Sequence, residues 1–270
     1  MHEMGAELTG TFLGHVIPGA ILTVWGLWWF WFVAAGLRRV GAGPRETQEE
    51  HRRRGPVTTA YAPIETALKL LVPVAAGLGD LWWASWRLTD SSVLNYQHAT
   101  AYLGFLLAGV TDLLARRGRV PGWVPHVALA GAFANAGFQF AAHGNHGPLS
   151  AAVHLFVIGL FSGEAAVLLL ELRHRHPALA VAKAYGLVLH GVWFFHVAWI
   201  LYRSGWDPES PYAVMRVNLF FTWDAMGVAV GLSLFYALLA VAARGRRRAA
   251  AGTGLGLAPA AGSRPGEASP

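Results

Sequence analysis

The sequence contains no cysteine among its 270 residues. This absence excludes disulfide bonds, cysteine-ligated zinc, iron–sulfur clusters and catalysis by a thiol. Charged residues are also scarce, at 13% of the chain, which is about half their share in a soluble domain. There is no P-loop, no dinucleotide-binding glycine motif and no His-Glu-x-x-His motif of zinc proteases. The last apolar run lacks the lysine that a retinal Schiff base requires.

Apolar residues are abundant instead. They make up 54% of the chain, with 12 tryptophans and 14 phenylalanines, and the mean hydropathy is +0.40. A soluble core of this size cannot bury so much apolar surface, so we expect the solvent to be lipid. The net charge is +6, but the basic residues lie between apolar runs, which favours membrane topology over nucleic-acid binding. We therefore expect a lipid bilayer, and no nucleic acid, as the partner.

Seven apolar runs of about twenty residues predict transmembrane helices. The second run is the least apolar, since it contains Glu65, Lys69 and Asp80. Proline inside such a run is tolerated because neighbouring helices can satisfy the freed backbone groups. The predicted helices cover residues 12–37, 64–84, 96–115, 122–142, 149–171, 179–202 and 216–242.

Basic residues are distributed unequally between the two sides of these helices. Sixteen of the 21 lysines and arginines lie in the loops and tail on one side, whereas only Arg87, Arg203 and Arg216 lie on the other. The positive-inside rule then places the N-terminus outside and the C-terminus in the cytoplasm. The predicted fold is all-α, a seven-transmembrane-helix bundle. Its parts are an outer N-terminus (1–11), the membrane domain (12–242) and a disordered cytoplasmic tail (243–270).

Ionisable side chains inside a span need a partner or a role, because leaving them against lipid costs free energy. Several of the 12 histidines and two aspartates lie close to the outer ends of different helices. At 1.5 Å per residue, the deepest of them lie about 8–12 Å below the outer boundary. This outer polar layer consists of His15, His98, His143, His146, His154, His196, Asp80 and Asp224.

The outer polar layer predicts a metal, haem or proton site. Imidazole and carboxylate are common ligands of zinc and copper, and imidazole also ligates haem. Imidazole also relays protons because it titrates near neutral pH. The candidate metal ligands are His15, His98, His146 and His154, with Asp80, His196 and Asp224 as candidate completing residues.

Two further interpretations of the layer stay open. In the first, the protein has a structural or interaction role, and these residues only make interhelical hydrogen bonds. In the second, it is an intramembrane metal-dependent hydrolase. No catalytic residue, substrate or protein partner is indicated, so the sequence does not decide whether the protein is an enzyme.

Other polar residues lie deeper or nearer the cytoplasmic side. His190 is close to mid-membrane and is expected to pack in the core. Glu164 is also deep, and it is a second-best candidate for relaying protons. Asp112, Glu171 and Lys183 lie near the cytoplasmic ends of their helices, where snorkelling toward water is sufficient to explain them.

A series of short motifs is shared with a known family. The most specific is Gly-His-Val-Ile-Pro-Gly at 14–19, followed by Gly-Leu-Trp-Trp at 26–29. Over roughly residues 10–242 the chain resembles the transmembrane protein 45 family, which consists of multi-pass proteins built around a domain of unknown function. The remaining motifs are Gln97-His98 with Asp112, His146-Gly147, Val153-His154, residues 191–195, Leu201-Tyr202, Trp206-Asp207 and residues 221–224.

The resemblance implies seven spans, a short outer N-terminus and a cytoplasmic tail, and it supplies no mechanism. The family has glutamine at the positions of His190 and His196, and histidine where this chain has Asp224. The site positions that the resemblance supports best are therefore His15, His98, His146 and His154. The lack of cysteine and the preference for arginine over lysine indicate a prokaryotic source, and thus a bacterial cell membrane.

Overall fold

The computed structural model describes residues 11–40, 62–143, 147–174 and 176–254, and in this part of the chain all regular structure is α-helical. An all-α fold is therefore confirmed. The seven helices found there are α1 (Phe12–Val40), α3 (Ala62–Trp83), α4 (Val93–Arg116), α5 (Val124–His143), α6 (Pro148–Arg173), α7 (Pro177–Tyr202) and α8 (Pro211–Gly254).

The helix boundaries follow local signals in the sequence. Proline is the first residue of α6, α7 and α8, where its missing N–H costs nothing and its fixed φ suits a helix. Each helix begins and ends within a few residues of its predicted bounds, except at the end of α8. This helix continues past 242 to Gly254, so the stretch 243–254, assigned to the tail by the sequence, is helical.

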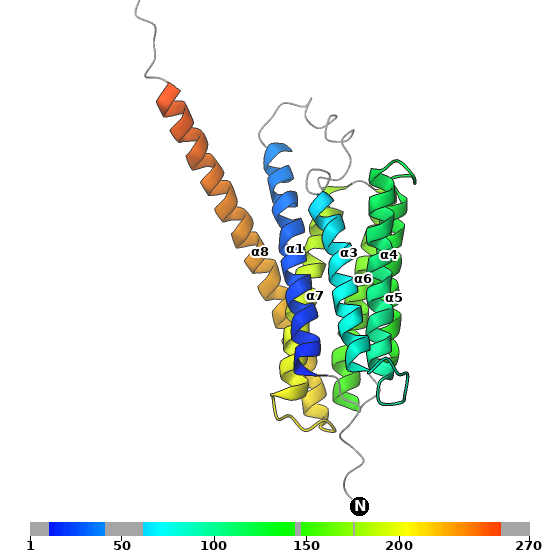
Figure 1. The fold of residues 1–270 in the computed structure, drawn as a ribbon. Helices are drawn as coiled ribbons and strands as arrows, with labels where there is room; N and C mark the ends of the chain where they lie inside the picture. The colour runs from blue at the N-terminus through cyan, green and yellow to red at the C-terminus, as the bar shows by residue number, and fades with distance from the viewer. Residues whose placement is uncertain (1–10, 41–61, 144–146, 175, 255–270) are drawn as a thin grey trace, which may run out of the picture. The chain divides into compact units, whose positions relative to one another are not determined.

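The helices pack as a series. The consecutive helices from α3 to α7 pack pairwise, α3 on α4, α4 on α5, α5 on α6 and α6 on α7, and α1 packs along α7 (Figure 1). The chain up to Leu232 forms one compact unit, and Ser233 begins a second unit that contains the rest of α8. In the first unit, α1, α4 and α6 end at the same end of the bundle. We refer to this end, the predicted cytoplasmic one, as the inner end, and to the opposite end as the outer end.

Glycines allow α1 and α7 to approach closely. A Cβ atom on Gly191 of α7 would lie 2.2 Å from Oγ1 of Thr23, and one on Gly26 of α1 would lie 2.6 Å from the backbone nitrogen of Val188. Neither position has room for a side chain. Small residues commonly occupy such contacts in membrane bundles, because they let two backbones meet. This contact holds α1 against the face of α7 that carries Val188, Gly191 and Phe194.

The exposed sides of the helices, around the circumference of the bundle, are apolar. Side chains such as Leu13, Val24, Leu71 and Leu155 are exposed on the helices, and a layer of lipid hydrocarbon would cover them. Five of the helices in the described part of the chain are long and apolar enough to cross a membrane, namely α1, α4, α6, α7 and α8. The chain is thus a multi-span helical membrane protein. The helices α3 and α5, which are also predicted as spans, are not among those five.

Candidate functional site

A pair of buried histidines lies near the outer end of the bundle. His15 of α1 and His154 of α6 are 4% and 3% exposed, and their ring centroids are 6.1 Å apart. The ring of His15 also lies 6.0 Å from that of Phe194 and 5.6 Å from that of Tyr202. Two of the four predicted metal ligands are therefore neighbours, although they are 139 positions apart in the sequence.

The backbone determines which nitrogen of each ring carries a proton. Nδ1 of His15 lies 3.1 Å from the carbonyl oxygen of Thr11, and Nδ1 of His154 lies 2.8 Å from that of Ser150. A carbonyl oxygen only accepts, so Nδ1 is the donor in both rings. Nε2 is then the basic nitrogen of each neutral ring, and Nε2 of His15 has no hydrogen-bond partner among the described residues.

Four further members of the outer polar layer lie in two separate pairs. Nδ1 of His98 is 3.7 Å from Oδ2 of Asp80. The other carboxylate oxygen of Asp80, Oδ1, accepts a hydrogen bond from the side chain of Asn95. The ring of Phe140 packs against both His98 and His154, at 6.2 and 6.1 Å between centroids. His98 is therefore joined to the outer pair through an aromatic ring.

His196 and Asp224 bind each other. Nδ1 of His196 lies 2.6 Å from Oδ2 of Asp224, which links α7 to the first part of α8. The imidazole lines an open cavity of about 350 Å³ together with Trp199 and Phe220. It lies on a different face of α7 from Phe194, the residue that contacts His15. These two candidate completing residues thus have each other as partners.

No metal-binding cluster is found in the part of the chain that the structure describes. No group of three or more histidine, aspartate or glutamate side chains there is arranged to hold a metal ion. His146 lies outside the described residues, so the four-histidine set stays a prediction.

His190 lies in the centre of the bundle with no polar contact. It is fully buried, and its ring lies 4.1 Å from that of Phe161 and 5.3 Å from that of Phe194. Neither ring nitrogen has a hydrogen-bond partner among the described residues. A buried polar group without a partner is costly, so this residue is a candidate for a function that depends on its nitrogens.

Glu164 lies one turn closer to the inner end. It is 3% exposed, and its Oε2 has no hydrogen-bond partner among the described residues. Its Oε1 occupies the space beside Gly186 of α7, since a Cβ there would be 2.3 Å away. Gly186 is four residues before His190, and Glu164 is three residues after Phe161, which contacts His190. Glu164 and His190 therefore occupy successive turns of the α6–α7 interface.

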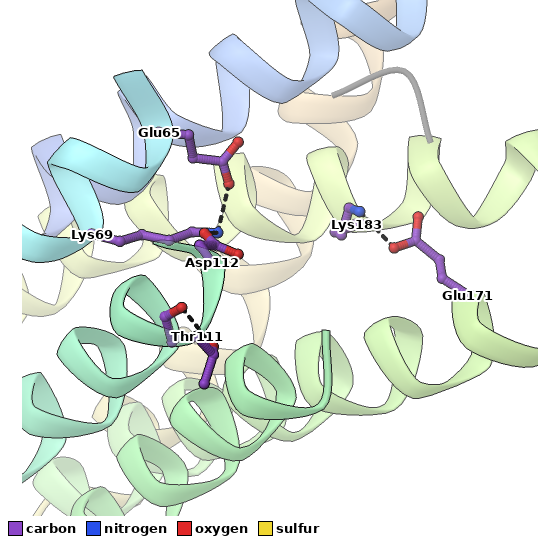
Figure 2. A network of polar contacts seen from close by, with 7 residues as sticks. Glu65, Lys69, Thr111, Asp112, Glu171 and Lys183 are labelled. Carbon is purple, nitrogen blue, oxygen red and sulfur yellow. Dashed lines mark hydrogen bonds and ion pairs between the residues drawn. The ribbon is translucent and has the colours of Figure 1, made fainter. Parts of the chain in front are cut away.

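Two groups of ion pairs lie at the inner end of the bundle (Figure 2). Nζ of Lys69 lies 2.9 Å from Glu65 of its own helix and 2.9 Å from Asp112 of α4. Nζ of Lys183 on α7 lies 2.5 Å from Glu171 of α6.

Both ammonium groups also lie near tryptophan rings of α1. Lys183 is 4.8 Å from the ring of Trp29, and Lys69 is 5.8 Å from that of Trp25, a distance at which cations and aromatic rings attract each other. Both lysines are buried. The sequence-based explanation for Lys183, Asp112 and Glu171 is therefore wrong. These side chains do not snorkel, because Lys183 binds Glu171 and Asp112 binds Lys69, in each case across helices.

The sequence reveals the depth of these groups but not their partners. The depth of a side chain in the membrane follows from its position along an apolar run, and the outer polar layer is predicted from the sequence on that basis. Pairing depends on how each helix is rotated about its axis, and the nearly uniform apolarity of these helices leaves that rotation unspecified. The pairs Lys69–Asp112 and Lys183–Glu171 are separated by 43 and 12 positions, and no local motif connects them.

A search against protein-family models finds none that matches the chain.

Proposed function

We propose that this protein relays protons across the membrane through buried titratable side chains in its bundle core. The proposed relay consists of Glu164, His190 and the outer pair His15 and His154. The observation that carries the proposal is the environment of His190, an imidazole buried at the centre with both nitrogens unbonded among the described residues. Imidazole accepts a proton at one nitrogen and releases one from the other, so it suits a relay.

The order of these groups along the bundle supports the proposal. Gly186, which adjoins Glu164, is four residues before His190, a rise of about 6 Å. Phe194 and Tyr202 of the same helix both contact His15, which places the outer pair roughly 12 Å beyond His190. The titratable groups thus form a line along the α6–α7 interface from the inner half to the outer half.

The line is interrupted by aromatic rings. Phe140 and Phe194, whose centroids are 5.8 Å apart, pack between the level of His190 and that of the outer pair. We refer to these two rings as the aromatic plug. A proton cannot cross it by a single hydrogen bond, so transfer requires a ring rotation or an entering water molecule. This arrangement supports a gated relay in preference to an open proton channel.

The packing alternative fits other residues better. His196 binds Asp224 of another helix, as expected for a histidine that ties helices together. The hydrogen bond of His15 is to Thr11, the residue before its own helix, and His190 has no hydrogen bond from its ring in the described part of the chain. Interhelical hydrogen bonding therefore explains His196 but gives no reason for His15 or His190.

We further propose that all seven helices cross the membrane, with the N-terminus outside. α3 and α5 have 22 and 20 residues, which is enough to span a bilayer core. Each is packed between helices that qualify as spans or beside one of them. Seven crossings also keep the basic loops on one side, and they agree with the topology implied by the resemblance to the transmembrane protein 45 family.

The proposal is tested by measuring proton flux into liposomes that contain the purified protein. A potassium gradient with valinomycin sets the membrane potential, and an enclosed pH-sensitive dye reports the flux. We expect flux above that of empty liposomes, and a loss of at least tenfold in His190→Leu and in His15→Ala.

The matched control is His196→Gln, which replaces a histidine of the same helix outside the proposed relay. We expect it to retain most of the flux. Flux equal to that of empty liposomes, or undiminished flux in His190→Leu, would overturn the relay.

A metal site is the second candidate function, and the closeness of His15 and His154 favours it. Nε2 of His15 is a basic nitrogen without a partner among the described residues, and the second imidazole lies beside it. Elemental analysis of protein purified without chelator tests this candidate, and the absorption spectrum tests for haem. We expect stoichiometric zinc or copper that is lost in His15→Ala, and its absence from the wild-type protein excludes a tightly bound metal.

A further inference from the structure

A cavity of about 340 Å³ lies at the inner end of the bundle. Six helices contribute to its wall, and the residues that line it include Glu65, Lys69 and Asp112, together with Lys183 of the second ion pair in Figure 2. Apolar residues such as Leu129 and Leu168 complete the wall. We refer to this space as the inner cavity. The titratable and charged residues that line it are Glu65, Lys69, Asp112, Arg116, His126 and Lys183.

The charges on this wall indicate what fills the cavity. Removing a carboxylate and an ammonium group from water costs more than their attraction returns, unless further hydrogen bonds satisfy them. Nζ of Lys69 has three N–H donors, of which Glu65 and Asp112 accept two. A space of this size has room for on the order of ten water molecules. Water in the inner cavity would supply the missing hydrogen bonds.

The inner cavity lies close to Glu164. Two residues of its wall are near neighbours of this carboxylate, namely Leu168, one turn further along α6, and Lys183, one turn before Gly186 on α7. Lys183 and Glu171 are the charged groups that act on Glu164 electrostatically. On its other side, Glu164 adjoins the turn that bears His190. It thus lies between a cavity with charged groups in its wall and a buried imidazole, and its Oε2 has no hydrogen-bond partner among the described residues.

We propose that the inner cavity is a water-filled vestibule open to the cytoplasmic side, and that Glu164 exchanges protons between this water and His190. For a proton that moves from the vestibule toward the outer end, an O–H bond of a hydronium ion breaks as the carboxyl O–H bond of Glu164 forms. That O–H bond then breaks as an N–H bond forms on His190, and the N–H bond at the other nitrogen of the imidazolium breaks as an O–H bond forms on a water molecule that enters on the side of the outer pair. The two groups are offset by about one turn of α7, a backbone rise of about 6 Å, and a water molecule entering between them would carry the proton across.

The role of Glu164 rests on the proposed function, because it assumes that the protein relays protons. The hydration of the inner cavity does not depend on the proposed function. The two parts are therefore tested by separate measurements.

Hydration is measured by thiol labelling, which is free of background because the natural chain has no cysteine. The test variant is Leu168→Cys in the wall of the inner cavity. The matched control is Val157→Cys, which lies eleven residues earlier on the same face of α6. Leu168 and Val157 are both buried, but only Leu168 lines the inner cavity. A membrane-impermeant, charged thiol reagent is added to inside-out vesicles.

We expect Leu168→Cys to react at least tenfold faster than Val157→Cys, and to react slowly in right-side-out vesicles. Equal rates at the two positions would overturn the vestibule. If Leu168→Cys does not fold, Ala115→Cys in the same wall replaces it with the same expected result.

The role of Glu164 is measured by proton flux in liposomes. We expect Glu164→Gln, which keeps the size of the side chain but not its acid, to reduce flux at least tenfold. In the double variant with Glu164→Gln and Leu168→Cys, the rate of thiol labelling should equal that of Leu168→Cys alone. Glu164→Asp should recover part of the flux, and Glu209→Gln, an exposed glutamate, serves as the control.

The outcomes are distinguishable. Fast labelling without wild-type flux would refute the relay and leave the vestibule intact. Wild-type flux that persists in Glu164→Gln would refute the role of Glu164 alone.

Discussion

Lys69 is the polar residue with the most charged partners in the described part of the bundle. Its ammonium group contacts both Glu65 and Asp112, and all three side chains are largely shielded from solvent. A cation shared by two carboxylates compensates both of them. The stability of the α3–α4 contact therefore depends on this one side chain more than on either acid.

We predict that Lys69→Met destabilises the protein by about 3–5 kcal/mol, because it leaves two buried carboxylates without a cation. Unfolding in detergent, followed by circular dichroism, measures the loss. Glu65→Gln leaves the Lys69–Asp112 pair intact and should cost less. The double variant with Lys69→Met and Glu65→Gln should recover part of the stability. If Lys69→Met costs less than Glu65→Gln, the shared-cation account is wrong.

For His190 we predict the opposite effect, namely that its replacement does not lower stability. Its imidazole makes no hydrogen bond in the described part of the structure and packs against the rings of Phe161 and Phe194. A leucine of similar volume removes the cost of burying two polar nitrogens. We predict that His190→Leu leaves stability unchanged or raises it by about 1 kcal/mol, although it abolishes proton flux.

The contrast for this prediction is His196→Leu. This change leaves the carboxylate of Asp224, which is 8% exposed, without its partner. It should therefore lower stability by about 1–3 kcal/mol. The same unfolding measurement applies to both variants. A larger loss in His190→Leu than in His196→Leu would indicate that His190 is a structural residue.

At the scale of helices, the apolar runs predict most of the fold. Each run of about twenty apolar residues became a helix, because in lipid a segment must satisfy its own backbone hydrogen bonds. α3 shows the limit of this reasoning. Its charged residues reduce its apolar character, and its place in the bundle depends on Lys69 reaching Asp112 of α4. A contact of that kind cannot be read from the composition of one run.

The contact between α1 and α7 leads to a prediction for two glycines. A methyl group on Gly191 would collide with Thr23 and with the backbone of α1, whereas one on Gly159 of α6 would meet nothing within 4 Å. We predict that Gly191→Ala lowers stability by about 1–3 kcal/mol through overpacking. Gly159→Ala should be neutral or slightly stabilising, because alanine favours helix.

Both substitutions replace a helical glycine with alanine, so helix propensity cancels between them. Thermal unfolding in the same detergent measures the difference. Equal stability of the two variants would show that α1 and α7 do not approach as closely as the structure has them.

At the scale of the whole molecule, the charges in the loops predict how the bundle is oriented in the membrane, whereas the helices do not. An apolar helix fits a bilayer in either direction, and no contact within the bundle favours one of the two orientations. The distribution of arginine does so, because basic loops are retained on the cytoplasmic side. Orientation thus depends on residues outside the packed core, which is why the sequence predicts it and the packing of the helices does not.

This orientation is tested in intact cells with the cysteine-free background of the chain. Asp90→Cys lies in the turn between α3 and α4 at the outer end, and Arg119→Cys lies between α4 and α5 at the inner end. We predict that an impermeant maleimide added outside the cells labels Asp90→Cys, and that it labels Arg119→Cys only after permeabilisation. Arg119 is preferred over its neighbour Gly118, whose φ of 66° would strain a cysteine. The reverse labelling pattern would invert the bundle, and the inner cavity would then open to the outside.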